Sequence, residues 1–364
     1  MSTADRSPSV PLKKRILLGS LPLIFSAAKL AIRWVGRAPR PRALRWAKVF
    51  SLPVAAISRK ASRRNQRVFF EPQGWSSERL SQLDLAYQEY MVRLRTECAA
   101  CLEAPRERVL AEIQFDGEDL LRDALRGGRG AMVIGTHYGT WWHAPVGLAG
   151  RGYPVGAVFN SFPLNGIEGY LVQKARRVGI ELNVVDRGAR EAIVRASRSN
   201  GVFYLTIDVA TRERERDWID FGPALVNVNP GPAILAVRER MPVFYALCEQ
   251  QSPRGSRIRI VPAAAGPSLR PSQMREEWAS LLLKEVRRRP EQWWAWGFVE
   301  LKSKPVAIPN HKGVMAHVPV GIRLQGESDD FKHLQAPVPG GRVSGGPGPR
   351  YRGRLCGNGN AVEL

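Results

Sequence analysis

The sequence predicts an α/β fold with a mainly parallel central sheet flanked by helices. Short apolar runs suited to buried strands alternate with helical stretches of about 10 residues, and such helices supply the crossovers that parallel strands need. Turn residues separate several of these runs. The chain has 364 residues, of which 44% are hydrophobic and 24% charged, so it has a globular composition and enough length for a sizeable core.

The predicted elements follow one another from residue 76 onward. Ser76 or Ser77 is a suitable N-cap for a long helix that ends before Pro105. The expected strands are, in order, 109–115, 131–135, 153–159, 180–185, 202–207, 243–249 and 256–262. The expected helices are 118–125, 140–148, 167–178, 189–198, 230–240 and 271–289. The strand runs are short and apolar, whereas the helical stretches carry apolar residues at helical spacing.

Composition divides the chain into three parts. Residues 1–70 carry sixteen Lys and Arg against one acid, and so supply most of the net charge of +22. Residues 71–302 hold the predicted α/β domain. Residues 303–364 are rich in Gly and Pro and lack periodicity, which predicts a disordered tail. The four cysteines form no disulfide or metal-binding pattern, so no metal is expected and a reducing compartment fits best.

The basic segment at the N-terminus predicts a membrane-associated helix. The apolar run 16–28 is flanked by Lys and Arg, and it is too short to span a bilayer, which takes about 20 residues. No cleavage site of a signal peptide follows it. Trp34, Trp46, Phe50 and Leu52 continue the mixture of apolar and basic residues, which suits an uncleaved anchor on an anionic leaflet. A solvated basic tail is the alternative, and no nucleic acid is expected because no groove-reading motif is present.

Polar residues directly after a predicted strand are the candidate functional residues, because ligands of open α/β sheets gather at the carboxyl ends of strands. His137 follows the strand 131–135, and its side chain suits a general base near neutral pH. A structural role in the adjacent turn fits equally well. Asp186 and Arg187 follow another strand and Asp208 closes a third, although each of these positions also suits a cap or a surface charge.

Taken in this order, the residues resemble the late acyltransferases of lipid A synthesis (lauroyl and myristoyl acyltransferases) and relatives that acylate phosphatidylinositol mannosides, within the lysophospholipid acyltransferase superfamily. The resemblance covers roughly residues 45–302. It rests on the strand ending at His137, the Asp186-Arg187 pair, Asp208, the runs Asp220-Phe221-Gly222 and Gly231-Pro232-Ala233-Ile234-Leu235-Ala236, and the closing Pro290-Glu291-Gln292-Trp293-Trp294-Ala295-Trp296. Asn160 begins Asn160-Ser161-Phe162-Pro163-Leu164, which matches an Asn-x-Pro-Leu-like element of the family.

The resemblance implies a glycerol-phosphate-acyltransferase-like fold and a membrane-associated enzyme. Such an enzyme moves a fatty acyl group from acyl carrier protein or acyl coenzyme A to a lipid, glycolipid or other amphiphilic acceptor, without a cofactor. Membrane lipids and the acyl donor are the expected partners, at the cytoplasmic face of a bacterial inner membrane. His137, Arg187 and Asp208 are the expected catalytic residues, with Asp186 as an auxiliary. Asn160, Trp141, Trp142 and Gly231 are the expected substrate-binding residues, and Trp293 to Trp296 are further candidates for the wall of an acyl-chain groove.

The sequence departs from the family at one position that bears on the chemistry. The family carries Asp or Glu five residues after its histidine, and here that residue is Trp142. Three explanations are open. Asp208 approaches His137 and restores the pair, His143 shares or replaces the base, or the protein has lost transfer chemistry and acts as a lipid-binding or scaffold protein. An enzyme with an amine or natural-product acceptor is a further alternative, because such a nucleophile needs less help from a base.

Overall fold

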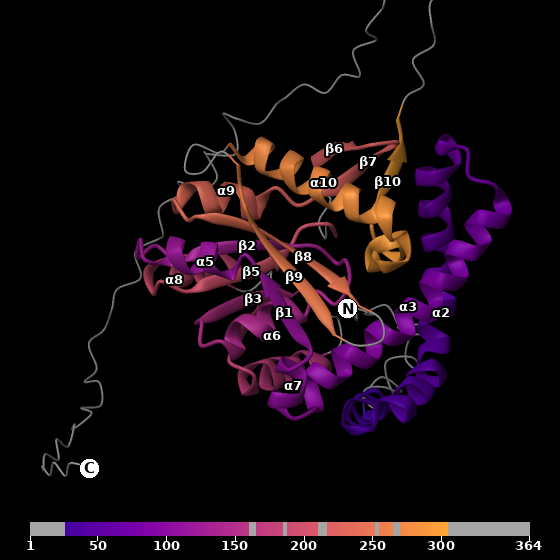
Figure 1. The fold of residues 1–364 in the computed structure, drawn as a ribbon, viewed down its shortest axis with the longest axis horizontal. Coiled ribbons are helices and arrows are strands. Elements are labelled where there is room, and N and C mark those ends of the chain that lie inside the picture. The colour runs from indigo at the N-terminus through magenta and orange to yellow at the C-terminus, as the bar shows by residue number, and fades with distance from the viewer. Residues whose placement is uncertain are drawn as a thin grey trace, which may run out of the picture. The chain divides into compact units, whose positions relative to one another are not determined.

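The computed structural model of this chain describes residues 26–159, 165–184, 188–209, 217–251, 255–264 and 270–304. Its centre is a seven-stranded sheet in the order β1-β9-β8-β2-β5-β3-β4 (Figure 1). The strands are β1 (Ile113–Asp116), β2 (Ala131–Gly135), β3 (Val155–Phe159), β4 (Ile180–Val184), β5 (Val202–Thr206), β8 (Val243–Gln250) and β9 (Ser256–Pro262). Only β8 and β9 pair antiparallel within this sheet, so the predicted class is confirmed.

Helices cover both faces of the sheet, and Figure 1 shows α10 on one side with α6 and α7 on the other. The helices are α2 (Arg40–Phe70), α3 (Ser77–Glu103), α4 (Arg106–Leu110), α5 (Glu118–Leu125), α6 (His143–Gly150), α7 (Asn165–Arg177), α8 (Ala189–Arg198), α9 (Gly231–Arg238) and α10 (Pro271–Arg288). Alternate residues of β2 enter different cores: Met132 and Ile134 pack with α3 and α10, whereas Val133 packs with α5 and α6. This period of two is the reason that the buried strands read as continuous apolar runs.

Most predicted elements are confirmed within two or three residues, and the helix 118–125 is found with the predicted bounds. Ser76 is the N-cap of α3, where its hydroxyl accepts a hydrogen bond from the amide of Arg79. The predicted strand 109–115 is wrong in its first half. Residues Arg106–Leu110 form α4, which begins after Pro105, and the strand β1 is confined to Ile113–Asp116.

A second, three-stranded antiparallel sheet was not predicted. It has the order β10-β7-β6, with β6 (Asp217–Phe221), β7 (Ala224–Val228) and β10 (Leu301–Ser303). The hairpin between β6 and β7 turns at Gly222, whose φ of 67° favours glycine and whose amide donates to Asp220 Oδ1. The run Asp220-Phe221-Gly222 therefore ends β6 and enters the hairpin turn.

Helix α2 carries the end of the basic N-terminal segment into the core. Phe69 and Phe70 are buried, and Asn65 donates hydrogen bonds to the carbonyls of Trp296 and Val299. Residues 26–37 form another helix before α2, but most of the apolar run 16–28 and nearly all of the Gly- and Pro-rich tail lie outside the described residues. No described helix is long and apolar enough to cross a membrane. The N-terminal membrane helix thus stays a prediction.

Candidate active site

His137 and Asp208 face each other at the carboxyl end of the central sheet. Strands β2 and β5 pair in parallel with Gly135 opposite Thr206, and each of the two site residues comes two positions after its paired residue. The same register therefore brings both side chains to the same edge. His137 Nδ1 lies 2.6 Å from Asp208 Oδ1, and the His137 amide donates to Asp208 Oδ2 at 2.8 Å.

The Asp208 carboxylate is completely buried, with a side-chain exposure of 0%. A third donor, the indole Nε1 of Trp293, lies 3.0 Å from Oδ2. Burial opposes ionisation of this group, but the charge of His137 and hydrogen bonds from His137 and Trp293 outweigh it and hold the pKa of Asp208 below its usual range. A buried carboxylate beside His137 is therefore kept in its charged form.

The second ring nitrogen of His137, Nε2, does not contact Asp208. In the neutral tautomer whose Nδ1–H donates to the carboxylate, Nε2 carries a lone pair and can accept a proton. The side chain is 17% exposed, and Thr206 Oγ1 lies 3.3 Å from Nε2. Trp141 and Trp294 stand against the imidazole, with ring centroids 5.0 and 4.8 Å away. The arrangement gives a histidine base with an oriented ring and an apolar aromatic wall.

A backbone clamp holds the turn that carries His137. The Trp294 amide donates to the His137 carbonyl at 2.9 Å, and the Gly139 amide donates to the Gln292 carbonyl at 2.9 Å. Between them, Tyr138 and Trp293 form an isolated antiparallel bridge. The closing aromatic run of the sequence thus lies against the turn after β2, although about 150 residues separate them in the chain.

Asp208 provides the carboxylate that the sequence lacks at position 142. Trp142 is the N-cap residue of α6 and packs, partly buried, against both cores. The acid beside the histidine therefore comes from the neighbouring strand rather than from the helix after β2. Of the explanations for Trp142, the geometry favours the one in which Asp208 restores the pair.

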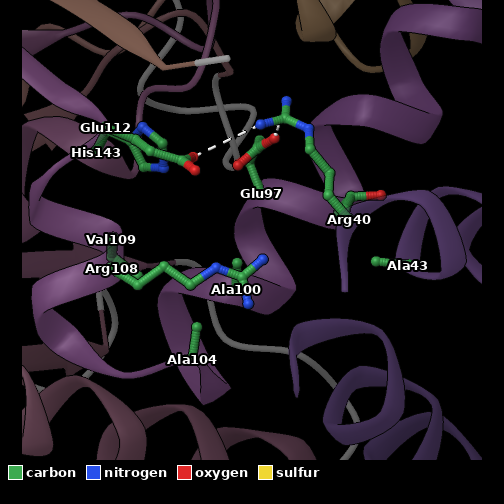
Figure 2. Close-up of a pocket in the computed structure, with 10 residues that line it drawn as sticks. Arg40, Ala43, Glu97, Ala100, Ala104, Arg108, Val109, Glu112 and His143 are labelled. Atoms are coloured by element: carbon green, nitrogen blue, oxygen red, sulfur yellow. Dashed lines mark ion pairs between the residues drawn. The ribbon is translucent and has the colours of Figure 1, made fainter. Parts of the chain in front are cut away.

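His143 lies in a different environment from His137. Its Nδ1 is 2.6 Å from Ser256 Oγ on β9, and it borders a cavity of about 20 Å³ beneath α2, α3 and α4. Figure 2 shows His143 beside Glu112, with the Arg40 guanidinium paired to both Glu97 and Glu112. Burial, with a smaller contribution from the Arg40 charge, lowers the pKa of His143 to about 4. This residue is a neutral hydrogen-bonding group of the interior at physiological pH.

Replacing His143 with Gln is expected to weaken the acid sensitivity of the fold. The folded-state pKa of about 4 lies below the ordinary 6.5, so the unfolded chain binds the proton first. Stability from this group is present above pH 6.5 and is lost as the pH falls toward 4, by about 2 kcal/mol at pH 5. Urea titrations of both proteins at pH 7.5 and pH 5 measure the difference. An unchanged pH dependence in the variant contradicts the assignment.

The remaining predicted site residues divide into two groups. Asn160, Asp186 and Arg187 lie outside the described residues. Among the others, Trp141 stands beside His137, and Gly231 begins α9, where its amide donates to Asn229 Oδ1. Trp293 and Trp296, expected on a groove wall, are fully buried, and only Trp294 of the closing run contacts the His137 ring. The aromatic run signals this segment in the sequence, but not which ring faces the histidine.

The fold is an α/β sheet that places a histidine–carboxylate pair at the carboxyl ends of two neighbouring parallel strands. The family model of the bacterial lipid A biosynthesis acyltransferases matches residues 24–296, and the chain belongs to that family. It is accordingly an acyltransferase that moves groups other than aminoacyl groups. A search of curated proteins finds no match to the chain.

Proposed function

We propose that this protein transfers a fatty acyl group from a thioester, carried by acyl carrier protein or coenzyme A, to a hydroxyl of a lipid-like acceptor. The observation that carries the proposal is the pair formed by His137 and the buried Asp208 carboxylate, 2.6 Å apart. Such a pair supplies a general base of fixed tautomer. The family match supports the acyl-transfer chemistry and a lipid-like acceptor.

The proposed reaction passes one proton through His137. Nε2 takes the proton of the acceptor hydroxyl as its oxygen attacks the thioester carbonyl carbon. When the tetrahedral intermediate collapses, the carbon–sulfur bond breaks and the imidazolium returns the proton to the departing thiolate. The products are an ester and a free thiol. Asp208 stays ionised throughout and stabilises the imidazolium.

We propose that Arg187 interacts with the acyl donor. The resemblance of Asp186-Arg187 to the family pattern motivates a role for Arg187 in binding donor phosphates or balancing the negative charge of the intermediate. Both acyl carrier protein and coenzyme A are acidic, and a chain with a net charge of +22 attracts them electrostatically.

Substituting His137 with Ala is expected to abolish transfer, with a loss of at least about 10³-fold, because the nucleophile loses its base. The measurement is the formation of acylated product from labelled acyl carrier protein and acyl coenzyme A, by detergent-purified protein with a mixed lipid extract. His143→Ala is the control, since His143 lies away from the pair. Equal product from wild type and His137→Ala would end the proposal.

We also propose that the enzyme binds an anionic membrane surface, and that residues 29–50 form the part that contacts the membrane. Trp34 is 58% exposed and stands edge-on to Trp46, which stacks on Phe50. The exposed apolar residues of this surface are Leu30, Trp34, Trp46, Val49 and Phe50, and its basic residues are Lys29, Arg33, Arg37, Arg42, Arg45 and Lys48. Aromatic and basic side chains together suit an interfacial helix.

The double change Trp34→Ser and Trp46→Ser is expected to weaken binding to phosphatidylglycerol-containing vesicles by about 10-fold or more, since each indole contributes apolar burial. Co-sedimentation with vesicles measures the effect. Leu85→Ser, which removes an exposed apolar side chain from α3, is the matched control and should leave binding unchanged. Loss of binding in the control alone, or in neither protein, would contradict a membrane role for this surface.

The non-catalytic alternative drew its support from the missing carboxylate at position 142. Because Asp208 occupies the place beside His137, that feature no longer favours a scaffold protein over an enzyme. An amine acceptor is likewise no longer needed to explain the site.

A further inference from the structure

The Asp208 carboxylate accepts hydrogen bonds from His137 and from one further residue. A carboxylate with no solvent contact must find all its hydrogen bonds inside the protein, or its burial becomes costly. Two of the donors to Asp208 belong to His137, its Nδ1 and its backbone amide. The third, Trp293 Nε1, is the donor to Asp208 that comes from another side chain of the described chain.

Trp293 is held rigidly in position. It lies between two short 3-10 helices, η4 (Pro290–Gln292) and η5 (Trp294–Gly297), and its backbone bridges to Tyr138 in the turn that carries His137. Its ring packs against Phe221 and Trp296, at centroid distances of 5.3 and 4.7 Å. The ring is fully buried, so its N–H cannot turn to water as an alternative partner.

The chemistry of an indole fixes what this contact does. An indole N–H donates and never accepts, so it accepts no proton from the carboxyl. It bonds to Oδ2, and this leaves Oδ1 directed at His137 Nδ1. The consecutive residues Trp293 and Trp294 thus contact different members of the pair. Trp293 donates to the Asp208 carboxylate, and Trp294 packs against the His137 imidazole.

We propose that Trp293 is a positioning residue of the transfer reaction, which fixes the orientation and charge of Asp208 and through it the proton-accepting state of His137. The inference rests on the proposed function. It also gives the carboxylate from the neighbouring strand a donor besides the histidine.

Trp293→Phe tests the inference, because Phe keeps most of the ring and removes the N–H. The matched control is Trp296→Phe. Trp296 is equally buried in the same aromatic cluster, but its N–H donates to the Pro290 carbonyl instead. Both variants are expected to lose similar thermal stability. Only Trp293→Phe is expected to lower kcat, by about 10-fold or more, with little change in KM, since a hydrogen bond to a charged group has been removed.

A pH profile separates positioning from a merely structural role. Without the indole donor, the carboxylate holds the imidazolium proton more strongly, so the acid limb of kcat/KM moves to higher pH in Trp293→Phe and not in Trp296→Phe. NMR titration of labelled histidines should show the same upward shift for His137 without any substrate. If Trp293→Phe does not fold, 3-benzothienylalanine at position 293 keeps the indole shape and replaces the N–H by sulfur.

The outcomes separate the inference from the proposed function. Equal kcat, equal profiles and equal His137 titration in Trp293→Phe and Trp296→Phe overturn the positioning role, even where His137→Ala proves inactive. Full activity in His137→Ala overturns the proposed function instead. The NMR titration still decides whether Trp293 tunes the pair in that case.

Discussion

Replacing Asp208 with Asn should lower kcat by about 10⁴-fold while leaving the fold intact. The amide has nearly the same shape as the carboxylate, but it carries no charge to stabilise the imidazolium. It also presents an N–H group where His137 Nδ1 needs an acceptor, which favours the wrong tautomer. Single-turnover acyl transfer with labelled donor measures the chemical step directly.

Asp116→Asn is the matched control for this change. Asp116 ends β1 and pairs with Arg257 in an exposed position, away from the pair at the end of β2 and β5. Its substitution should leave kcat unchanged. A rate for Asp208→Asn within a few-fold of wild type would show that the carboxylate beside His137 has no part in the chemistry.

Gly139→Ala is expected to destabilise the protein by about 2–5 kcal/mol. Gly139 has a φ of 59°, which L-residues adopt at a cost, and an added Cβ would collide with the backbone carbonyl oxygen of Cys248 on β8. A strand backbone cannot move aside as a flexible side chain can. The Gly139 amide also belongs to the clamp on the Gln292 carbonyl, so the displaced turn should carry His137 out of place and reduce transfer as well.

Gly74→Ala separates the two contributions to that loss. Gly74 also has a positive φ, 77°, but an added Cβ there meets no atom within 4 Å. Its cost should be confined to the backbone conformation, about 1–2 kcal/mol, with no effect on kcat. Chemical denaturation of both variants measures the difference. Equal losses of unfolding free energy in Gly139→Ala and Gly74→Ala would mean that β8 moves aside for the added Cβ at little cost.

The sequence identifies both residues of the pair and offers their contact as one of three explanations, but it does not decide among the three. Asp186 and Asp208 each follow a predicted strand, and Asp208 is the one expected to approach His137, whereas Asp186 lies outside the described residues. The strand order accounts for the contact with Asp208, because β5, which Asp208 follows, is hydrogen-bonded to β2. That order depends on long-range packing, which local patterns do not encode.

Two other features escaped prediction for local reasons. The strands β6 and β7 are short and contain polar residues such as Asp217 and Asn227, so they lack the apolar run that marks the parallel strands. In α2, apolar residues among many Arg and Lys suggested a lipid surface. In the structure, one part of that helix, including Ala43 and Phe69, packs against protein. A hydrophobic pattern predicts that a helix face is buried, but it does not tell whether lipid or protein covers that face.

The pairing of Gly135 with Thr206 has a consequence for when the enzyme becomes chemically competent. His137 and Asp208 meet only after β2 and β5 have joined in this register, and a slip of one residue would turn the two side chains to different faces. A nascent or partly unfolded chain therefore lacks the proposed base, and it cannot use that base to hydrolyse the thioester donor. Turnover in a refolding experiment would accordingly report the moment at which the centre of the sheet assembles.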